Sequence, residues 1–324
     1  MRRVLAFLAV SALLLSGSAA GASASAARAP VPHVGACPVF PKRNFWNTDI
    51  SHLKVDRRSK AWLAHMSTGR SLHPDFGPSY GDGPDYGIPI TTVTSAHPLV
   101  HVGFQYADES DQVGYPLGSD TRIEGGAGSD GDRHAVVVDT SSCRVYETWL
   151  TQLTSGGWTA GSGATWSLRS NALRPNGWTS SDAAGLPILP GLLRWDEVAA
   201  GHVNHAIRFT TDQTAAAHTW PARHDAGSGP ASTYPPMGAR FRLKKGWKPT
   251  GLGRDARVVV RAMKKYGLVL ADNGSPWFFQ GEQNAAWPDQ LVSDLKRIPA
   301  SAFVAVNTRP LRISANSAKA RQHR

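Results

Sequence analysis

The feature that most constrains the fold is a pair of cysteines, Cys37 and Cys143, the only two among the 324 residues. An even number of cysteines in an exported chain indicates a disulfide bond. This bond would close a loop of about a hundred residues, for which the loop-entropy model gives on the order of 4–5 kcal/mol. We therefore predict that the bond ties the mature N-terminus to a central strand and that neither cysteine is a catalytic nucleophile.

The first 29 residues have the composition of a secretory signal peptide. Met-Arg-Arg precedes an apolar run over Val4–Leu15, which only Ser11 interrupts, and small residues follow. This order predicts a signal peptide over residues 1–29 that is cleaved on export. The apolar run is shorter than the roughly 20 residues needed to span a bilayer. We predict a secreted, extracellular protein without a membrane span.

The net charge of +11 is concentrated at the two ends of the chain. Eight of the basic residues lie there: Arg2, Arg3, Arg28, Arg309, Arg312, Lys319, Arg321 and Arg324. Without them the body carries +3, so a nucleic-acid partner is not expected. We predict one extracellular β-rich domain over residues 30–308, present as a monomer. The basic residues 309–324 contain no acidic residue and are predicted to be a disordered tail.

Short strands separated by turn residues dominate the pattern. The clearest hairpin joins residues 134–139 to residues 144–150, and valines on both faces of its first strand predict a strand covered on both sides. One amphipathic helix is expected over residues 255–266, ended by Gly267. This pattern favours a mainly β fold, an antiparallel β-sandwich or jelly-roll-like single domain with a few short helices.

Asp132 and His134 begin the best strand, with Asp139 at its end and Glu147 on the paired strand. An Asp/His pair at the mouth of a strand can hold a catalytic acid or base at the rim of a sheet. The alternative is structural: Asp132 caps the loop and His134 packs at the sheet edge.

A second candidate group lies in residues 176–210. Glu197 is in a predicted short helix, and His205 and Arg208 are in the following strand. A carboxylate beside an imidazole raises its pKa and fixes its tautomer, which would suit catalysis. His205 also shares a face with Ile207 and Phe209, however, which is typical of a hydrogen-bonded core histidine.

Eleven tryptophans occur, several of them in loops beside polar groups. Loop tryptophans near Asp, Asn, Arg and His are typical of a sugar-binding cleft, although most tryptophans of such a domain fill its core. We predict substrate contacts from Trp178, Arg208, His224 and Trp277. Asp272, in the turn that precedes Trp277, is predicted to be catalytic.

No motif for a cofactor or a metal is present, and none is expected to bind. Asp130-Gly131-Asp132 resembles part of a calcium loop but lacks the remaining ligands, so a structural calcium ion has no further support. Residues 77–81 match G-x-S-x-G, but their flanking prolines and glycines prevent the helix that a nucleophile elbow requires.

Several phrases resemble those of a family of secreted bacterial proteins without an assigned activity. They are LHPDFG, YADESD, GDRHAVVVD with the following C-x-V-Y-E, LRPNGWTSSDAAGLPILPGLLRWDEV, HAIRFT, PPMGARFRLK and LADNGSPWF, between about Phe45 and Val306. The resemblance implies one extracellular domain and assigns no catalytic residue.

The leading hypothesis is a carbohydrate-active enzyme, a glycoside hydrolase or polysaccharide lyase, that acts on an extracellular polysaccharide or cell-wall glycan. A glycosidase needs two carboxyls about 5–9.5 Å apart, and a lyase needs a base and a cation that neutralises a uronate. The predicted catalytic residues are Asp132, His134, Glu197, His205 and Asp272. The alternative is a non-catalytic protein that binds glycan or cell wall. A third hypothesis is a metal-dependent hydrolase with His134, His205 and His224 as ligands.

Overall fold

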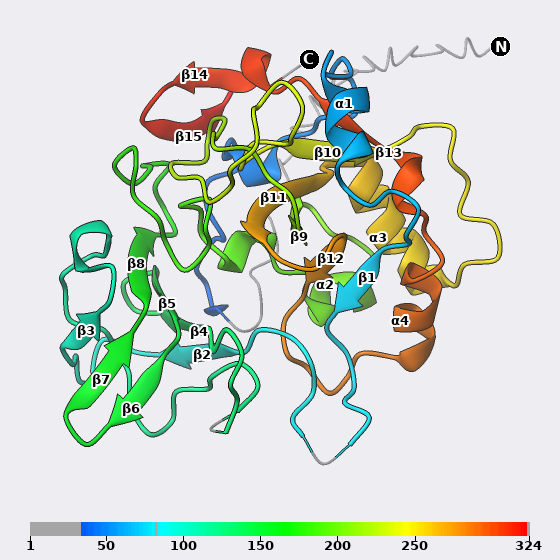
Figure 1. The fold of residues 1–324 in the computed structure, drawn as a ribbon. Helices are drawn as coiled ribbons and strands as arrows, with labels where there is room; N and C mark the ends of the chain where they lie inside the picture. The colour runs from blue at the N-terminus through cyan, green and yellow to red at the C-terminus, as the bar shows by residue number, and fades with distance from the viewer. Residues whose placement is uncertain (1–33, 82, 127, 323–324) are drawn as a thin grey trace, which may run out of the picture.

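The computed structural model describes residues 34–81, 83–126 and 128–322 (Figure 1). The predicted signal peptide over residues 1–29 lies outside them. A disulfide joins Cys37 to Cys143, with their Cα atoms 5.4 Å apart, as the cysteine count predicted. Thr140–Cys143 is the turn that connects two central strands, so the bond holds the N-terminal segment against the β-sheet that carries them.

The largest sheet has six strands, three of them from the last sixty residues. Their order is β1(His73–Asp75), β12(Phe278–Gln280), β9(Ile207–Thr211), β11(Leu268–Asn273), β10(Arg240–Leu243) and β13(Phe303–Val306). The pairs β1–β12 and β9–β11 are parallel and the others are antiparallel. Its central strands β9, β10 and β11 are almost entirely buried.

Two smaller sheets lie beside the large one (Figure 1). The first has four strands in the order β2(Ile90–Val93), β4(Ala135–Asp139), β5(Arg144–Trp149) and β8(Ser162–Ser167). The second has three, in the order β3(Val102–Phe104), β7(Gly157–Ala160) and β6(Gln152–Thr154). The predicted hairpin is present as β4–β5, and its valines pack on both sides: Val136 and Val138 in one core cluster, Val137 in another.

The expectation of a mainly β fold with a few short helices is confirmed, but the sheets are mixed and do not form a clear antiparallel sandwich. Four strand pairs are parallel, including β2–β4 and β3–β7. The sequence could not predict the direction of the strands. Alternating apolar residues indicate that a strand has two different faces, but they do not indicate its direction relative to a neighbouring strand. Parallel partners such as β9 and β11 are distant in sequence, and β10 and α3(Arg254–Lys265) lie between them.

The helices are short and lie against the large sheet. Besides α3 they are α1(Ser59–Ala64), α2(Trp195–Ala199) and α4(Asp289–Leu295), with 3-10 turns η2(Phe45–Asn47), η3(Ala107–Glu109), η4(Leu189–Gly191), η5(Ala300–Ala302) and η6(Arg309–Leu311). The predicted helix is α3, which buries Val259, Ala262 and Met263 and is followed by Gly267 at φ 73°. No helix in the described ranges is long and apolar enough to cross a membrane.

Residues 309–322 are folded, which corrects the prediction of a disordered tail. β14(Arg312–Ser314) and β15(Ser317–Ala320) form a hairpin, and Leu311 and Ala320 are completely buried in the main core. The basic side chains suggested a solvated segment, but they alternate with small and apolar residues that the core accepts. This hairpin also holds a distant loop, since Trp220 Nε1 donates to Ser317 O at 2.9 Å and Arg223 Nη1 donates to Ala315 O at 2.9 Å.

Candidate active site

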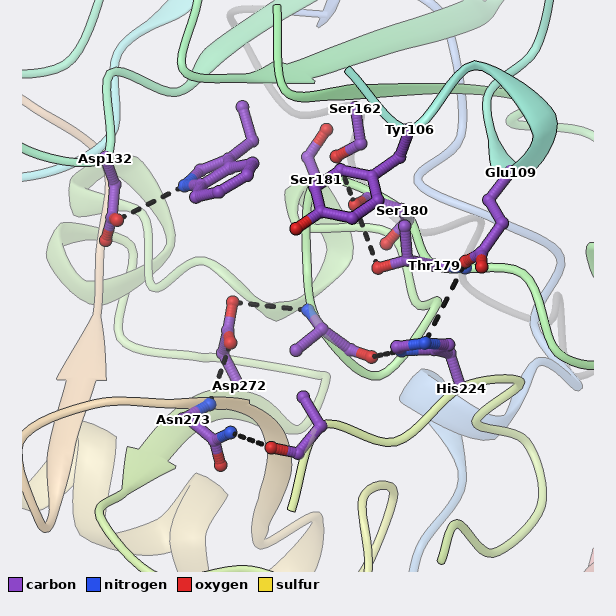
Figure 2. Close-up of a pocket in the computed structure, with 13 residues that line it drawn as sticks. Tyr106, Glu109, Asp132, Ser162, Thr179, Ser180, Ser181, His224, Asp272 and Asn273 are labelled. Atoms are coloured by element: carbon purple, nitrogen blue, oxygen red, sulfur yellow. Dashed lines mark hydrogen bonds and ion pairs between the residues drawn. The ribbon is translucent and has the colours of Figure 1, made fainter. Parts of the chain in front are cut away.

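A cavity of about 380 Å³ lies between one end of the four-stranded sheet and one end of the six-stranded sheet (Figure 2). Asp132, Trp149 and Ser162 reach it from the ends of β4, β5 and β8. Asp272 and Asn273 reach it from the end of β11. The rest of the lining consists of Tyr106 and Glu109 at η3, the loop residues Thr179, Ser180, Ser181 and Ala183, and His224 and Ala226. We refer to this cavity as the acidic pocket, because Glu109, Asp132 and Asp272 all face it.

Asp272 has the most perturbed environment in the pocket. Its Oδ1 accepts from the Asn273 backbone N–H at 2.8 Å and its Oδ2 accepts from that of Ala183 at 3.3 Å. A quarter of its side chain is exposed, within the concave pocket. Burial, and next the repulsion from Asp182, raise the pKa of Asp272 to about 7. The carboxyl therefore keeps its proton to a higher pH than an ordinary aspartate does, which is the condition a general acid requires.

Arg208 lies below Asp272 but is bound to a different carboxylate. Its Nε donates to Asp182 Oδ2 at 3.1 Å and its Nη2 donates to Asp182 Oδ1, so the pair is bidentate. Asp182 is completely buried, and its charge outweighs burial and raises the pKa of Arg208. Arg208 Nη2 is 3.9 Å from Asp272 Oδ2. Arg208 was predicted to contact substrate; the structure instead places it beneath the pocket, where it is only 2% exposed.

Asp132 faces the same pocket from the other sheet. Its Oδ1 accepts from Trp149 Nε1 at 3.2 Å, which orients the carboxylate (Figure 2). The Trp149 ring lies against Gly161, where an added Cβ would be 2.2 Å from an indole carbon. Trp149 also lies at the pocket wall with Tyr106, their ring centroids 6.4 Å apart. Asp132 and the two rings thus form one wall, and only a glycine at position 161 leaves room for it.

Glu109 and His224 form the opposite wall (Figure 2). Glu109 Oε2 accepts from the Thr179 backbone N–H at 2.8 Å. His224 Nδ1 lies 2.8 Å from Ala183 O, an acceptor, so this nitrogen carries the proton. His224 Nε2 is 3.8 Å from Glu109 Oε2. His224 therefore lines the pocket, and its contact with a substrate stays a prediction.

His134 lies outside the pocket lining and contacts the backbone of Ser181, which lines the pocket. Its Nδ1 is 2.6 Å from Glu124 Oε2 and its Nε2 is 3.1 Å from Ser181 O, so both nitrogens face acceptors. Burial opposes the charged ring, but the Glu124 carboxylate outweighs it and raises the pKa of His134 to about 9. Because His134 is 3% exposed and does not line the pocket, it positions the Ser181 loop and has no direct access to a ligand.

Glu197 and His205, whose contact the sequence left open, do meet, but away from the pocket. His205 Nε2 is 2.8 Å from Glu197 Oε2, which also pairs with Arg194 Nη2 at 2.7 Å. Burial lowers the pKa of His205, which is 2% exposed. None of the three lines the acidic pocket. The expectation that Glu197 and His205 are catalytic is corrected: this group closes the core around α2.

Two residues that were predicted to contact substrate, Trp277 and Trp178, lie outside the pocket lining. Trp277 is completely buried in the aromatic core, where its ring centroid is 5.4 Å from those of Phe209 and Phe303. It has no surface with which to contact a ligand. Trp178 is half-buried outside the pocket lining, and the Arg174 guanidinium lies 5.4 Å from its ring centroid.

The metal hypothesis required three histidines to meet, and they do not. His134 binds Glu124, His205 binds Glu197, and His224 faces Glu109. Within the described ranges, no group of three or more His, Cys, Asp or Glu side chains is arranged to hold a metal ion. This geometry overturns the proposed ligand set.

A second cavity of about 400 Å³ lies beside Glu124, the partner of His134. It is lined by Asp75, Asp85 and Glu124 and by the exposed Tyr80 and Tyr86. Burial raises the pKa of Asp75. Ser79, Gly81 and Gly83 of the glycine-rich segment also line this cavity.

Ten of the thirteen residues that line the acidic pocket were not predicted from the sequence, among them Tyr106, Glu109 and Trp149. Tyr106 and Trp149 carry no motif, and Glu109 was one of many possible carboxyls. The signal that could have found Trp149 is its position at the end of β5, the strand paired with the one that Asp132 precedes. Comparisons with protein-family models, with curated proteins and with solved structures found no match.

Proposed function

We propose that this protein is an extracellular glycoside hydrolase whose acidic pocket cleaves a polysaccharide. The observation that carries the proposal is that Asp272 and Asp132 face one cavity from two different sheets, and that the pKa of Asp272 is raised to about 7. Glycosidases use two carboxyls on either side of the scissile bond, and one of them acts as a general acid with a raised pKa.

Asp272 is assigned as the acid. Its proton passes to the glycosidic oxygen as the C–O bond breaks, which leaves Asp272 ionised beside Arg208 at 3.9 Å. The Arg208 guanidinium stabilises this negative charge. Before the reaction it does not fully pair with Asp272, because it donates two hydrogen bonds to Asp182. Asp132, oriented by Trp149, supplies the second carboxylate, which takes a proton from the water whose oxygen forms the new bond to the anomeric carbon.

The two aromatic rings support a sugar as the ligand. Tyr106 is half-exposed at the pocket mouth and Trp149 forms its wall. The apolar face of a pyranose can pack on such rings while its hydroxyls reach the carboxyls. A lyase is less well supported, because a uronate needs a cation and no Lys or Arg is among the residues that line the pocket.

The proposal is tested by a reducing-sugar assay over a panel of neutral, cationic and acidic polysaccharides. We expect release of reducing ends by the unmodified protein and a loss of at least about a hundredfold in Asp272→Asn and in Asp132→Asn. The matched control is Asp289→Asn, an exposed aspartate of α4 outside the pocket lining, which should keep full activity. A glycan that is bound and never cleaved would favour a non-catalytic binding protein, and new absorbance at 235 nm would favour a lyase.

A further inference from the structure

We infer that the acidic pocket takes a sugar with a free, positively charged amino group, so that its substrate is a glycan of 2-amino sugars. The inference rests on the proposed hydrolase function and names its substrate class. It is carried by the charges of the lining, by the direction of its hydrogen bonds, and by one buried hydroxyl without a partner.

Acidic side chains outnumber basic ones in the pocket lining. Glu109, Asp132 and Asp272 face the cavity, and His224 is the only basic side chain among the lining residues. The cation beneath the floor, Arg208, directs its Nε and Nη2 to Asp182. The Glu109 and Asp132 carboxylates would repel an anionic sugar that enters this cavity, whereas they would attract an ammonium.

The hydrogen-bond donors of the lining mostly point into the protein. Trp149 Nε1 donates to Asp132, Asn273 Nδ2 donates to Ala226 O at 2.7 Å, and His224 Nδ1 donates to Ala183 O. Ser162 and Ser180 likewise donate to backbone carbonyls at 2.7 and 2.6 Å. Carboxylate oxygens have further acceptor capacity, so the pocket presents acceptors and its ligand must supply donors. Hydroxyls and an ammonium do this, whereas a carboxylate or sulfate does not.

Ser181 shows that one polar position is left for a ligand. Its Oγ is buried and has no hydrogen-bond partner among the described residues, although Ser181 lines the pocket and is only 3% exposed. A buried hydroxyl without a partner is unfavourable in the empty protein, and a polar group of the ligand would satisfy it. Loss of this hydroxyl would remove no hydrogen bond within the protein.

The test is calorimetric binding of three probes of equal length to the full protein: oligomers of glucosamine, of N-acetylglucosamine and of galacturonic acid. We expect glucosamine oligomers to bind at least about tenfold more tightly than either of the others, with an affinity that falls as salt rises because the attraction is between charges. Glu109→Gln should reduce this preference several-fold, and Ser181→Ala should weaken glucosamine binding with an unchanged melting temperature. Asp289→Asn serves as the control.

The outcomes separate the two proposals. Equal or tighter binding of the N-acetylated or acidic oligomer overturns the inference, as does the absence of glucosamine binding, even if another polysaccharide is hydrolysed. Tight binding of glucosamine oligomers without any cleavage supports the inference on the ligand and overturns the proposed hydrolase. A Ser181→Ala variant that binds as tightly as the unmodified protein removes Ser181 from the subsite.

Discussion

Arg208 Nη2 lies 3.9 Å from Asp272 Oδ2 while its Nε and Nη2 are hydrogen-bonded to Asp182. The Arg208 guanidinium therefore forms hydrogen bonds with Asp182 and only a longer ionic contact with Asp272. Asp182 holds the charge that stabilises Arg208, and Asp272 keeps a proton because burial and Asp182 oppose its ionisation. The proposed acid owes its raised pKa first to burial and next to Asp182, a residue that does not reach the pocket.

The pH dependence of activity follows from Asp272. Its acid form is lost as pH rises through about 7, so we expect kcat to fall above that pH. The folded protein also holds this proton more tightly than the unfolded chain, where the pKa is 3.8. The free energy of unfolding should therefore decrease between about pH 4 and 7, and less so in Asp272→Asn. A pH–rate profile without a basic limb near 7 would remove Asp272 as the acid.

The substitution Asp182→Asn should shift the basic limb of the pH–rate profile to lower pH. Without the Asp182 charge, Arg208 is free to pair with Asp272, and the pKa of Asp272 should fall by about one unit or more. Breaking a buried ion pair also costs about 3–5 kcal/mol, which urea unfolding would measure. The conservative Asp111→Asn, at a partly exposed ion pair with Arg174, is the control and should leave the limb in place.

Gly161→Ala should damage the pocket and spare the fold. The new Cβ would meet the Trp149 indole at 2.2 Å, so the ring must move and release Asp132. We expect KM to rise about tenfold, equivalent to about 1.4 kcal/mol of binding. Steady-state kinetics and a thermal melt check this, and Gly156→Ala, which has no atom closer than 3.7 Å to its new Cβ, is the matched control.

Removal of the disulfide should lower stability by about 4–5 kcal/mol, because the loop it closes spans 106 residues. The double variant Cys37→Ala and Cys143→Ala measures this in denaturant. Activity under native conditions should remain, since neither cysteine lines the acidic pocket. An unchanged unfolding midpoint would show that the N-terminal segment is held by packing alone.

Truncation after Thr308 should destabilise the protein and weaken substrate binding. The lost hairpin carries buried Leu311 and Ala320 and binds Arg223, the neighbour of His224. We expect a lower melting temperature and a raised KM. Arg312→Ala, which removes only an exposed basic side chain, should change neither.

The parts of the structure that follow from local pattern were predictable. The β4–β5 hairpin, α3 and the disulfide each depend on nearby residues or on a count. The parallel pairs and the position of Arg208 depend on crossovers that local pattern does not encode. Asp132 was chosen at the mouth of a strand, Asp272 in a turn and His224 beside a loop tryptophan, and the three do share a pocket, whereas Glu197, His205 and Trp277 fit the core equally well and lie outside that pocket. In a sequence, a polar residue of the core cannot be distinguished from a catalytic residue, because only the structure shows which side chains are buried.

The C-terminal hairpin has a consequence for how the molecule is made. Lys319 forms an isolated antiparallel β-bridge with Asn44, and the Ala320 backbone N–H donates to Arg43 O at 2.7 Å. Nearly three hundred residues of sequence separate the partners in each pair. A ribosome or an export channel would release the first segment long before its partner exists. Folding of the main core can therefore finish only after residue 320 has emerged, and a nascent chain would stay incomplete until then.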